Sequence, residues 1–232
     1  MTDVLERASA LRVHGDETAG CTRCPLAATR GQVVFGSGNP DAELLLVGEA
    51  PGFHEDQSGV PFVGQAGQLL ERLLASIGLD RSDVYVANLL KCRPPQNRDP
   101  LPEEIAACEP HLFRQIELIR PTVVAALGNV ATRLLSGRDV GITRVHGQEQ
   151  QVTLGGKAVV LYPLYHPAAA LYTPSMLGVL ERDFARIPAL LGATVPPEGS
   201  GRSELPDDRV PNAAPGTTPI DAGREAVQLG LF

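Results

Sequence analysis

Short, uniformly apolar runs alternate with segments of helical periodicity, and this alternation constrains the fold more than any other feature. The runs at 43–48 (ELLLVG) and 122–128 (TVVAALG) are apolar at consecutive positions, which is typical of strands buried on both faces of a parallel sheet. Between them, 65–78 and 102–119 carry leucine and isoleucine at i, i+3 and i+4 spacing, which predicts amphipathic helices. The alternation predicts an α/β fold with helices on both sides of a parallel sheet.

Weaker patterns supply the remaining elements. We expect helices at 3–14, 129–135 and about 174–191, strands at 32–35 and 83–90, and a pair of strands within 150–164. Residues 1–194 then form one domain. Residues 195–232 are rich in proline and glycine and poor in large apolar residues, so we expect a disordered tail without a core of its own.

The sequence shows neither a membrane-spanning segment nor a secretion signal, and both observations bear on where the protein is located in the cell. No apolar run approaches the roughly 20 residues that a membrane-spanning helix needs, and 1–17 mixes charges of both signs without the apolar core of a secretion signal. We therefore expect a cytoplasmic protein, in which cysteines stay reduced.

Three predicted strands end in unusual polar segments. GEAPG (48–52) follows the first apolar run, ANLLKC (87–92) closes another strand, and YHP (165–167) closes a third. Because ligands of open α/β sheets bind beyond the carboxyl ends of the strands, these segments predict a site at one edge of the sheet.

The four cysteines form one spacing pattern: Cys21 and Cys24 in a CxxC turn, then Cys92, then Cys108. Thiolates suit a soft metal centre, and both a four-cysteine zinc site and an iron–sulfur cluster satisfy this pattern. Four unrelated buried thiols are the simpler alternative. A catalytic cysteine is disfavoured, since no cysteine lies beside a suitable base in the sequence. The residues alone predict a metal site and leave the metal open.

The charge of the chain does not suggest nucleic acid. Its formal net charge is −7, whereas tight non-specific DNA binders carry a broad basic face. Basic residues do gather locally, and we expect a few phosphate contacts from them. The local set is Lys91, Arg93, Arg98, Arg138, Arg144 and His146.

Several motifs together resemble one family. GEAPGFHED (48–56), PFVG (61–64), NLLKCRPPQNRDP (88–100) and YHPAAAL (165–171), in this order and with the cysteine set, resemble the iron–sulfur-containing, thermostable-type (family 4) uracil-DNA glycosylases. The resemblance implies a three-layer α/β/α sandwich with a four-stranded, mainly parallel sheet. It also implies a monofunctional, monomeric enzyme that excises uracil from single- or double-stranded DNA, and a 4Fe-4S cluster on the four cysteines.

The same resemblance assigns the pocket. An asparagine amide at position 88 can accept from uracil N3–H and donate to O4, the reverse of what cytosine requires. Phe62 offers a face for base stacking, and His166 can donate to uracil O2 and stabilise the departing anion. Leu171 is the expected wedge for the space left by the flipped base. The expected uracil-binding set is Glu49, Ala50, Pro51, Phe62, Asn88 and His166.

The group that positions the catalytic water is less well defined. In another branch of this superfamily an aspartate and a tyrosine stand where this chain has Ala50 and Gly52. Glu49 and Glu55 are the preferred candidates here, ahead of Asn97. Two further positions depart from the family pattern: Tyr172 follows the wedge, and His146 stands where arginine is common. The segment 92–102 contains no histidine, so we expect ordinary turnover without covalent capture of DNA.

The segment Gln228, Leu229, Gly230, Leu231, Phe232 resembles the short peptide by which bacterial repair proteins dock on the sliding clamp, with Gly230 in place of serine or aspartate. An apolar anchor on a flexible tether fits such a groove. Two other functions compete with the glycosylase: a catalytically inactive iron–sulfur DNA-binding or clamp-adaptor protein, and a nucleoside or nucleotide hydrolase on the same fold. An adaptor would need neither Asn88 nor His166, and a nucleoside hydrolase would need neither wedge nor clamp peptide.

Overall fold

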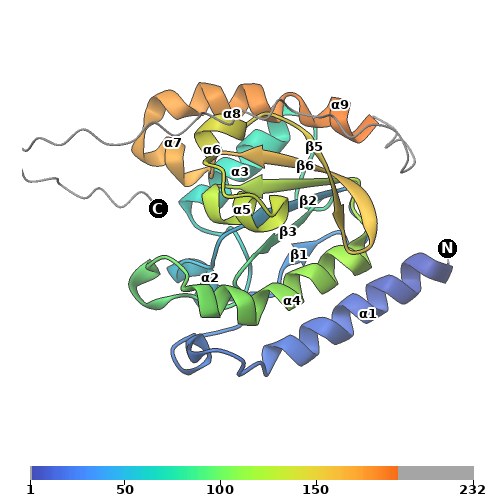
Figure 1. The fold of residues 1–232 in the computed structure, drawn as a ribbon, viewed down its shortest axis with the longest axis vertical. Coiled ribbons are helices and arrows are strands. Elements are labelled where there is room, and N and C mark those ends of the chain that lie inside the picture. The colour runs from blue at the N-terminus through green and yellow to red at the C-terminus, as the bar shows by residue number, and fades with distance from the viewer. Residues whose placement is uncertain (1, 193–232) are drawn as a thin grey trace, which may run out of the picture. The chain divides into compact units, whose positions relative to one another are not determined.

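The computed structural model describes residues 2–192, and within this range one sheet forms the central layer (Figure 1). The strand order is β1-β3-β2-β4-β6-β5. The four inner strands run parallel, and the two edge strands are antiparallel to their neighbours. The strands are β1 Ser37–Gly38, β2 Leu44–Gly48, β3 Tyr85–Asn88, β4 Val123–Leu127, β5 Gln150–Leu154 and β6 Lys157–Leu164.

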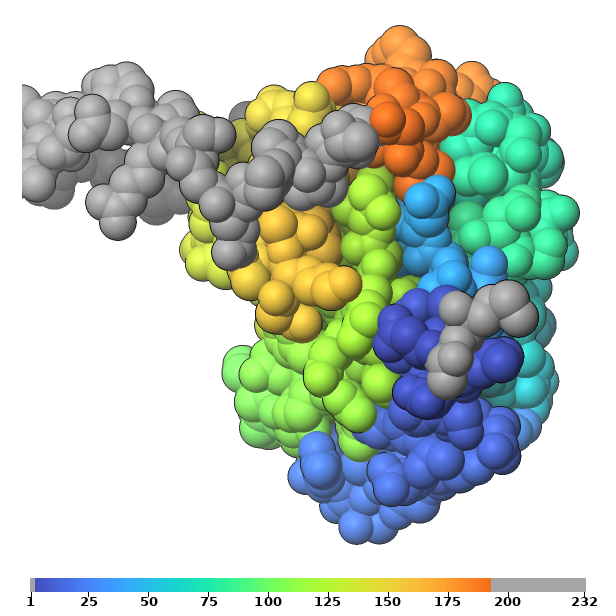
Figure 2. Space-filling view, turned by 90° about the vertical axis from the view of Figure 1, so that its right-hand side faces the viewer, coloured from blue at the N-terminus to red at the C-terminus, as the bar shows by residue number. Residues whose placement is uncertain are grey.

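Helices cover both faces of this sheet. Helices α1 and α4 lie on one face, and α3, α8 and α9 lie on the other (Figures 1 and 2). The predicted α/β/α sandwich is therefore confirmed. The helices are α1 Thr2–Ala19, α2 Phe53–Ser58, α3 Gln65–Ser76, α4 Pro102–Ile119, α5 Asn129–Ser136, α6 Ile142–Val145, α7 Ala168–Tyr172, α8 Leu177–Phe184 and α9 Ile187–Gly192.

The uniformly apolar strands are explained by these two layers. Along β2, Leu45 and Val47 pack into the core beneath α4, whereas Leu44 and Leu46 pack into the core beneath α3 and α8. Successive side chains of a strand point to opposite faces, so a strand covered on both sides must be apolar at every position. No helix among residues 2–192 is long and apolar enough to cross a membrane.

The structure corrects the predicted elements in three places. The sheet has six strands in the described range, and the expected four correspond to its parallel centre. Residues 32–35 are not a strand, because the N–H of Val34 donates to the carbonyl of Lys91 in the loop beyond β3, and the edge strand β1 follows instead. The predicted helix at 174–191 is divided between α8 and α9, since Pro188 lacks the N–H that would continue the helix. The predicted tail at 195–232 lies outside the described residues.

A buried carboxylate fixes the start of α4. Glu104 is 1% exposed, and its two carboxylate oxygens accept from both terminal nitrogens of Arg98, at 2.6 and 2.9 Å. The same carboxylate accepts from the backbone N–H of Leu101 at 2.9 Å. The Arg98 guanidinium holds the pKa of Glu104 below its ordinary value. This contact attaches the 93–100 loop to the helix that carries Cys108.

We predict that Glu104→Gln lowers the free energy of unfolding by about 1–3 kcal/mol, because Arg98 loses its charged partner in a buried position. A carboxyl whose pKa is lowered by folding stabilises the protein above its unfolded pKa. The difference between parent and variant should therefore be full at neutral pH and should shrink as the pH falls below the ordinary value of 4.5. Denaturant unfolding at several pH values measures it. Glu103→Gln, an exposed change in the same turn, is the control, and equal effects of the two variants would contradict the prediction.

Candidate active site and four-cysteine site

The segments predicted to converge do meet at the carboxyl edge of the sheet. Gly48 and Asn88 are the last paired residues of β2 and β3, and His166 follows the end of β6. The rings of Phe62 and His166 are stacked with centroids 5.5 Å apart and an interplanar angle of 28°. Residues from three strand ends and one loop thus form one cluster.

Gly48 makes this cluster possible. A Cβ atom at position 48 would lie 2.4 Å from Oδ1 of Asn88 and 2.7 Å from Cζ of Phe62. Both distances are far shorter than a van der Waals contact, so any side chain would displace the amide, the ring or both. Asn88 itself is 2% exposed. A buried amide beside an aromatic face can read the hydrogen-bonding edge of a flat heterocycle.

Three contacts fix the backbone on either side of Phe62 and so position its ring. Phe62 has a φ of 55°, which is unfavourable for a bulky residue. Its carbonyl packs so closely on Gly67 that a Cβ there would lie 1.8 Å from the oxygen. Arg81 donates to the carbonyl of Pro61 at 2.8 Å. Oε1 of Glu55 accepts from the backbone N–H groups of Val63 and Gly64, both at 2.9 Å.

The protonation of His166 follows from its surroundings. Its Nδ1 accepts a hydrogen bond from the backbone N–H of Ala168 at 3.2 Å, so in the neutral ring the proton resides on Nε2. Burial lowers the pKa of His166 to about 4, and nearby Glu55 opposes this shift only in part. At neutral pH the ring is uncharged and can donate through Nε2.

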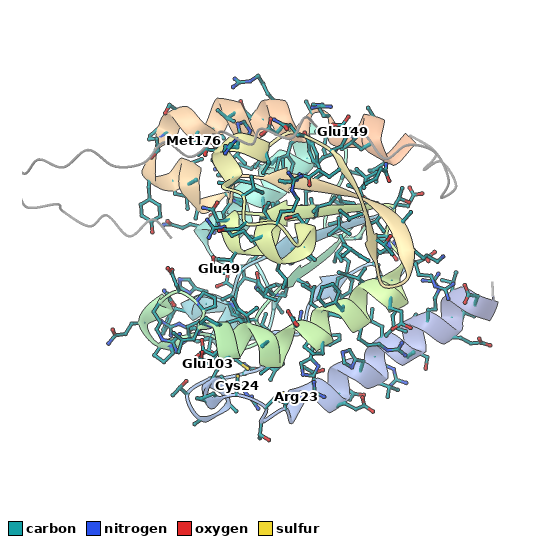
Figure 3. The ribbon with its side chains drawn as sticks, viewed as in Figure 1. Arg23, Cys24, Glu49, Glu103, Glu149 and Met176 are labelled. Carbon is teal, nitrogen blue, oxygen red and sulfur yellow. The ribbon has the colours of Figure 1, made fainter. Side chains whose placement is uncertain are left out.

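The acidic candidates differ in environment. Burial raises the pKa of Glu49 above its ordinary value, and Asp99 adds to the effect. Figure 3 shows Glu49 at the strand-end side of the sheet, apart from the region around Cys24. Glu55 is engaged through Oε1 with the Phe62 loop. The side-chain oxygen of Asn97 accepts from Nε of Arg93 at 2.7 Å.

The remaining expected residues differ in how far they are exposed. Pro51 is buried and Ala50 is half-buried, beyond the end of β2. Leu171, the expected wedge, lies on α7 and is 41% exposed, and the neighbouring Tyr172 is 78% exposed. These two side chains give α7 an apolar surface close to His166 in the chain.

The four cysteines line one small cavity, and none forms a disulfide. Polar groups from several elements contact their sulfur atoms. Nη1 of Arg30 lies 3.5 Å from Sγ of Cys92, the backbone nitrogen of Lys91 lies 3.2 Å from Sγ of Cys108, and Nε2 of His111 lies 3.4 Å from Sγ of Cys21. Among the described residues, no group of three or more histidine, cysteine, aspartate or glutamate side chains is arranged so that it could hold a metal ion. Sulfur donors beside N–H groups and cations nevertheless fit an anionic metal–thiolate group.

Several expected phosphate contacts have internal partners instead. Lys91 is 1% exposed, which corrects the expectation that it contacts DNA. Arg98 is paired with Glu104, and the guanidinium of Arg93 lies 5.1 Å from the ring centre of Phe53. Nδ1 of His146 contacts the Asp183 carboxylate at 2.8 Å.

Reasoning from sequence missed the roles of Gly48, Arg81 and Lys91. The glycine at the end of an otherwise apolar strand was a usable signal, because such a position often permits close approach. Nothing in the sequence indicated that Lys91 points inward or that Arg81 reaches the carbonyl of Pro61.

Comparison with known proteins shows the family to which the chain belongs. The model of the uracil DNA glycosylase superfamily matches residues 35–187. A type-4 uracil-DNA glycosylase of Archaeoglobus fulgidus is 47% identical over 184 residues, covering 78% of this chain and 92% of the relative. One from Saccharolobus solfataricus is 46% identical over 79% of this chain and 87% of its own length, and one from Thermotoga maritima is 46% identical over 71% and 85%. The chain therefore belongs to the uracil-DNA glycosylase superfamily, and within it to the type-4 enzymes.

Proposed function

We propose that this protein is a monofunctional glycosylase that hydrolyses the N-glycosidic bond of deoxyuridine in DNA, leaving an abasic site and free uracil. The observation that carries the proposal is the cluster of Asn88, Phe62 and His166 around Gly48 at the carboxyl edge of the sheet. The chain belongs to the type-4 enzymes, and the proposal extends to single- and double-stranded substrates.

Recognition requires the base to leave the stack. Phe62 then stacks on one face of uracil, and the Asn88 amide accepts from N3–H through Oδ1 and donates to O4 through Nδ2. Cytosine would place an acceptor against Oδ1 and a donor against Nδ2, leaving buried groups unpaired. Ala50 and Pro51 border this pocket, and Leu171 fills the space in the duplex.

Bond cleavage follows from the neutral His166. As the bond from N1 to C1′ breaks, its electron pair moves onto uracil, and Nε2–H donates to O2 where charge develops. Water adds to C1′, loses a proton to solvent or a nearby carboxylate, and the uracil anion is later protonated. The glycosylase needs no positive charge on His166 for this step.

We assign the two acidic residues different tasks. Glu49 lies at the end of β2 in a partly buried position, which suits a carboxylate that orients the attacking water. Glu55 uses Oε1 to hold the Phe62 loop, so its contribution to catalysis includes positioning the stacking ring.

We further propose that Cys21, Cys24, Cys92 and Cys108 hold a 4Fe-4S cluster. The four cysteines would hold the cluster from the 21–24 turn, the loop after β3 and helix α4, and metal–thiolate bonds would link these three segments. Arg30 and the backbone N–H of Lys91 contact its sulfur ligands. This structural role needs no redox step.

Substitution of Asn88 or His166 by alanine should reduce uracil excision roughly 100- to 1000-fold, because each variant loses hydrogen bonds to the base that stabilise the transition state. Alkali treatment of a uracil-bearing oligonucleotide after incubation measures abasic sites, and circular dichroism checks the fold. Tyr172→Phe, a conservative change at the rim, is the control. Parent-like rates in both alanine variants would mean that the pocket lies elsewhere.

The cluster should be detectable in the purified protein. In the parent protein we expect iron and acid-labile sulfide in similar amounts, together with broad visible absorbance. Cys92→Ser should lose the iron, the sulfide and the absorbance, and its melting temperature should be lower by at least about 5 °C. Asn88→Ala should keep its iron and serves as the matched variant. A colourless protein that contains zinc instead would refute the iron–sulfur assignment.

Delivery to DNA is proposed to depend on the segment 228–232, which lies outside the described residues. Its likeness to sliding-clamp-binding peptides and the internal use of several basic side chains support this proposal. We also propose that the protein acts as a monomer in the cytoplasm. The inactive-adaptor alternative is not favoured, because an adaptor would not require the assembled pocket.

Deletion of 228–232 should abolish binding to a bacterial sliding clamp and leave excision on naked oligonucleotides unchanged. Surface plasmon resonance on immobilised clamp measures the first effect and the abasic-site assay the second. Deletion of a segment of equal length at 211–215 is the control for tail length. Undiminished clamp binding after the 228–232 deletion would contradict the proposal.

A further inference from the structure

Lys91 is a buried cation between the four-cysteine site and the proposed uracil pocket. The chain has two lysines, Lys91 and Lys157, and only the first is buried, with 1% of its surface exposed. Its Nζ donates to the carbonyl of Asn88 at 2.7 Å and to Oε1 of Gln115 at 2.5 Å. Both hydrogen-bond acceptors are neutral oxygens, and the groups whose negative charge favours this ammonium are the nearby sulfur atoms of Cys108 and Cys92.

The acceptors are themselves fixed. Nε2 of Gln115 donates to the carbonyl of Phe35 at 2.9 Å, which determines that Oε1 faces Lys91. The ring of Phe35 lies under the ammonium, with its centre 5.9 Å from Nζ. A buried ammonium is costly unless it is hydrogen-bonded, and here the hydrogen bonds lead to one functional neighbour, Asn88.

The backbone of Lys91 is equally constrained. Its N–H contacts Sγ of Cys108 at 3.2 Å, and its carbonyl accepts from Val34 at 2.8 Å. Asn88 is the last residue of β3 in register with β2, and the following N–H groups, of Leu89 and Leu90, bond back to Gly48 and Glu49. The Asn88 carbonyl is thus held, at the end of β3, by a side chain that lies three residues further along the chain.

We propose that Lys91 is the positioning residue for Asn88: its ammonium fixes the peptide group of Asn88, and so the direction of the amide that distinguishes uracil from cytosine. This inference rests on the proposed function of Asn88. Because Lys91 precedes Cys92 and its backbone contacts Cys108, the same residue ties the recognition amide to the four-cysteine site.

Replacement of Lys91 by methionine, which keeps the length of the side chain and removes its donors, tests the proposal. Lys157→Met, at the exposed start of β6, is the matched control. Affinity is measured for oligonucleotides with a single 2′-fluoro-2′-deoxyuridine or 2′-fluoro-2′-deoxycytidine, which resist cleavage. We expect Lys91→Met to keep the parent iron content and to lower the uracil-over-cytosine affinity ratio at least roughly 10-fold. Lys157→Met should keep the parent ratio.

A double-mutant cycle separates positioning from general destabilisation. If Lys91 acts through Asn88, Lys91→Met should reduce kcat/KM strongly in the parent and by less than about 3-fold in Asn88→Ala. An unchanged affinity ratio, or an equal loss of kcat/KM in both backgrounds, would overturn the proposal. If Lys91→Met does not fold or retains no iron, Lys91→Gln, which replaces the ammonium by a shorter neutral side chain, carries the same test, and a parent-like ratio in that variant overturns the proposal. Absence of excision in the parent would instead refute the proposed function.

Discussion

The parallel pairing of β2 with β3 determines where the functional groups lie. Its last register pair joins Gly48 to Asn88, and this places an amide directly beside a position that has no side chain. The same strand end leads into the loop that carries Phe62. Since both strands are buried on both faces, their register cannot slip without moving apolar side chains into the wrong layer. Core packing therefore sets the geometry of the pocket.

The parts of the fold that follow from periodicity were predictable. The apolar strands and the helices α3 and α4 match their sequence patterns because burial on one or two faces leaves a direct record in side-chain type. The segment 32–35 has the composition of a strand, yet its backbone bonds to the loop after β3. Local propensity cannot reveal a partner that lies nearly sixty residues away.

In the candidate site, too, some features were predictable from the sequence and others were not. Sequence motifs indicated Asn88, Phe62 and His166, whose residue types carry chemistry. The groups that hold them were not evident: Gly67 beneath the carbonyl of Phe62, and Ala168, whose N–H selects the tautomer of His166. The role of Ala168 depends on a backbone N–H that almost any residue type supplies, and the role of Gly67 depends on a contact with a residue outside its helix that local sequence does not reveal.

Charge offers the last link between structure and function. The chain has 20 basic and 27 acidic residues, and two basic residues expected to meet DNA are used inside the protein, Lys91 on Asn88 and Arg98 on Glu104. Arg81, which was not in the expected set, is used on the carbonyl of Pro61. Each of these cations stabilises a loop that shapes the pocket. These cations are not available for phosphate contacts or for the counterion release that such contacts produce. Under the proposed function, contacts with the extruded base then add to the affinity for DNA, and these contacts are made only when uracil is present.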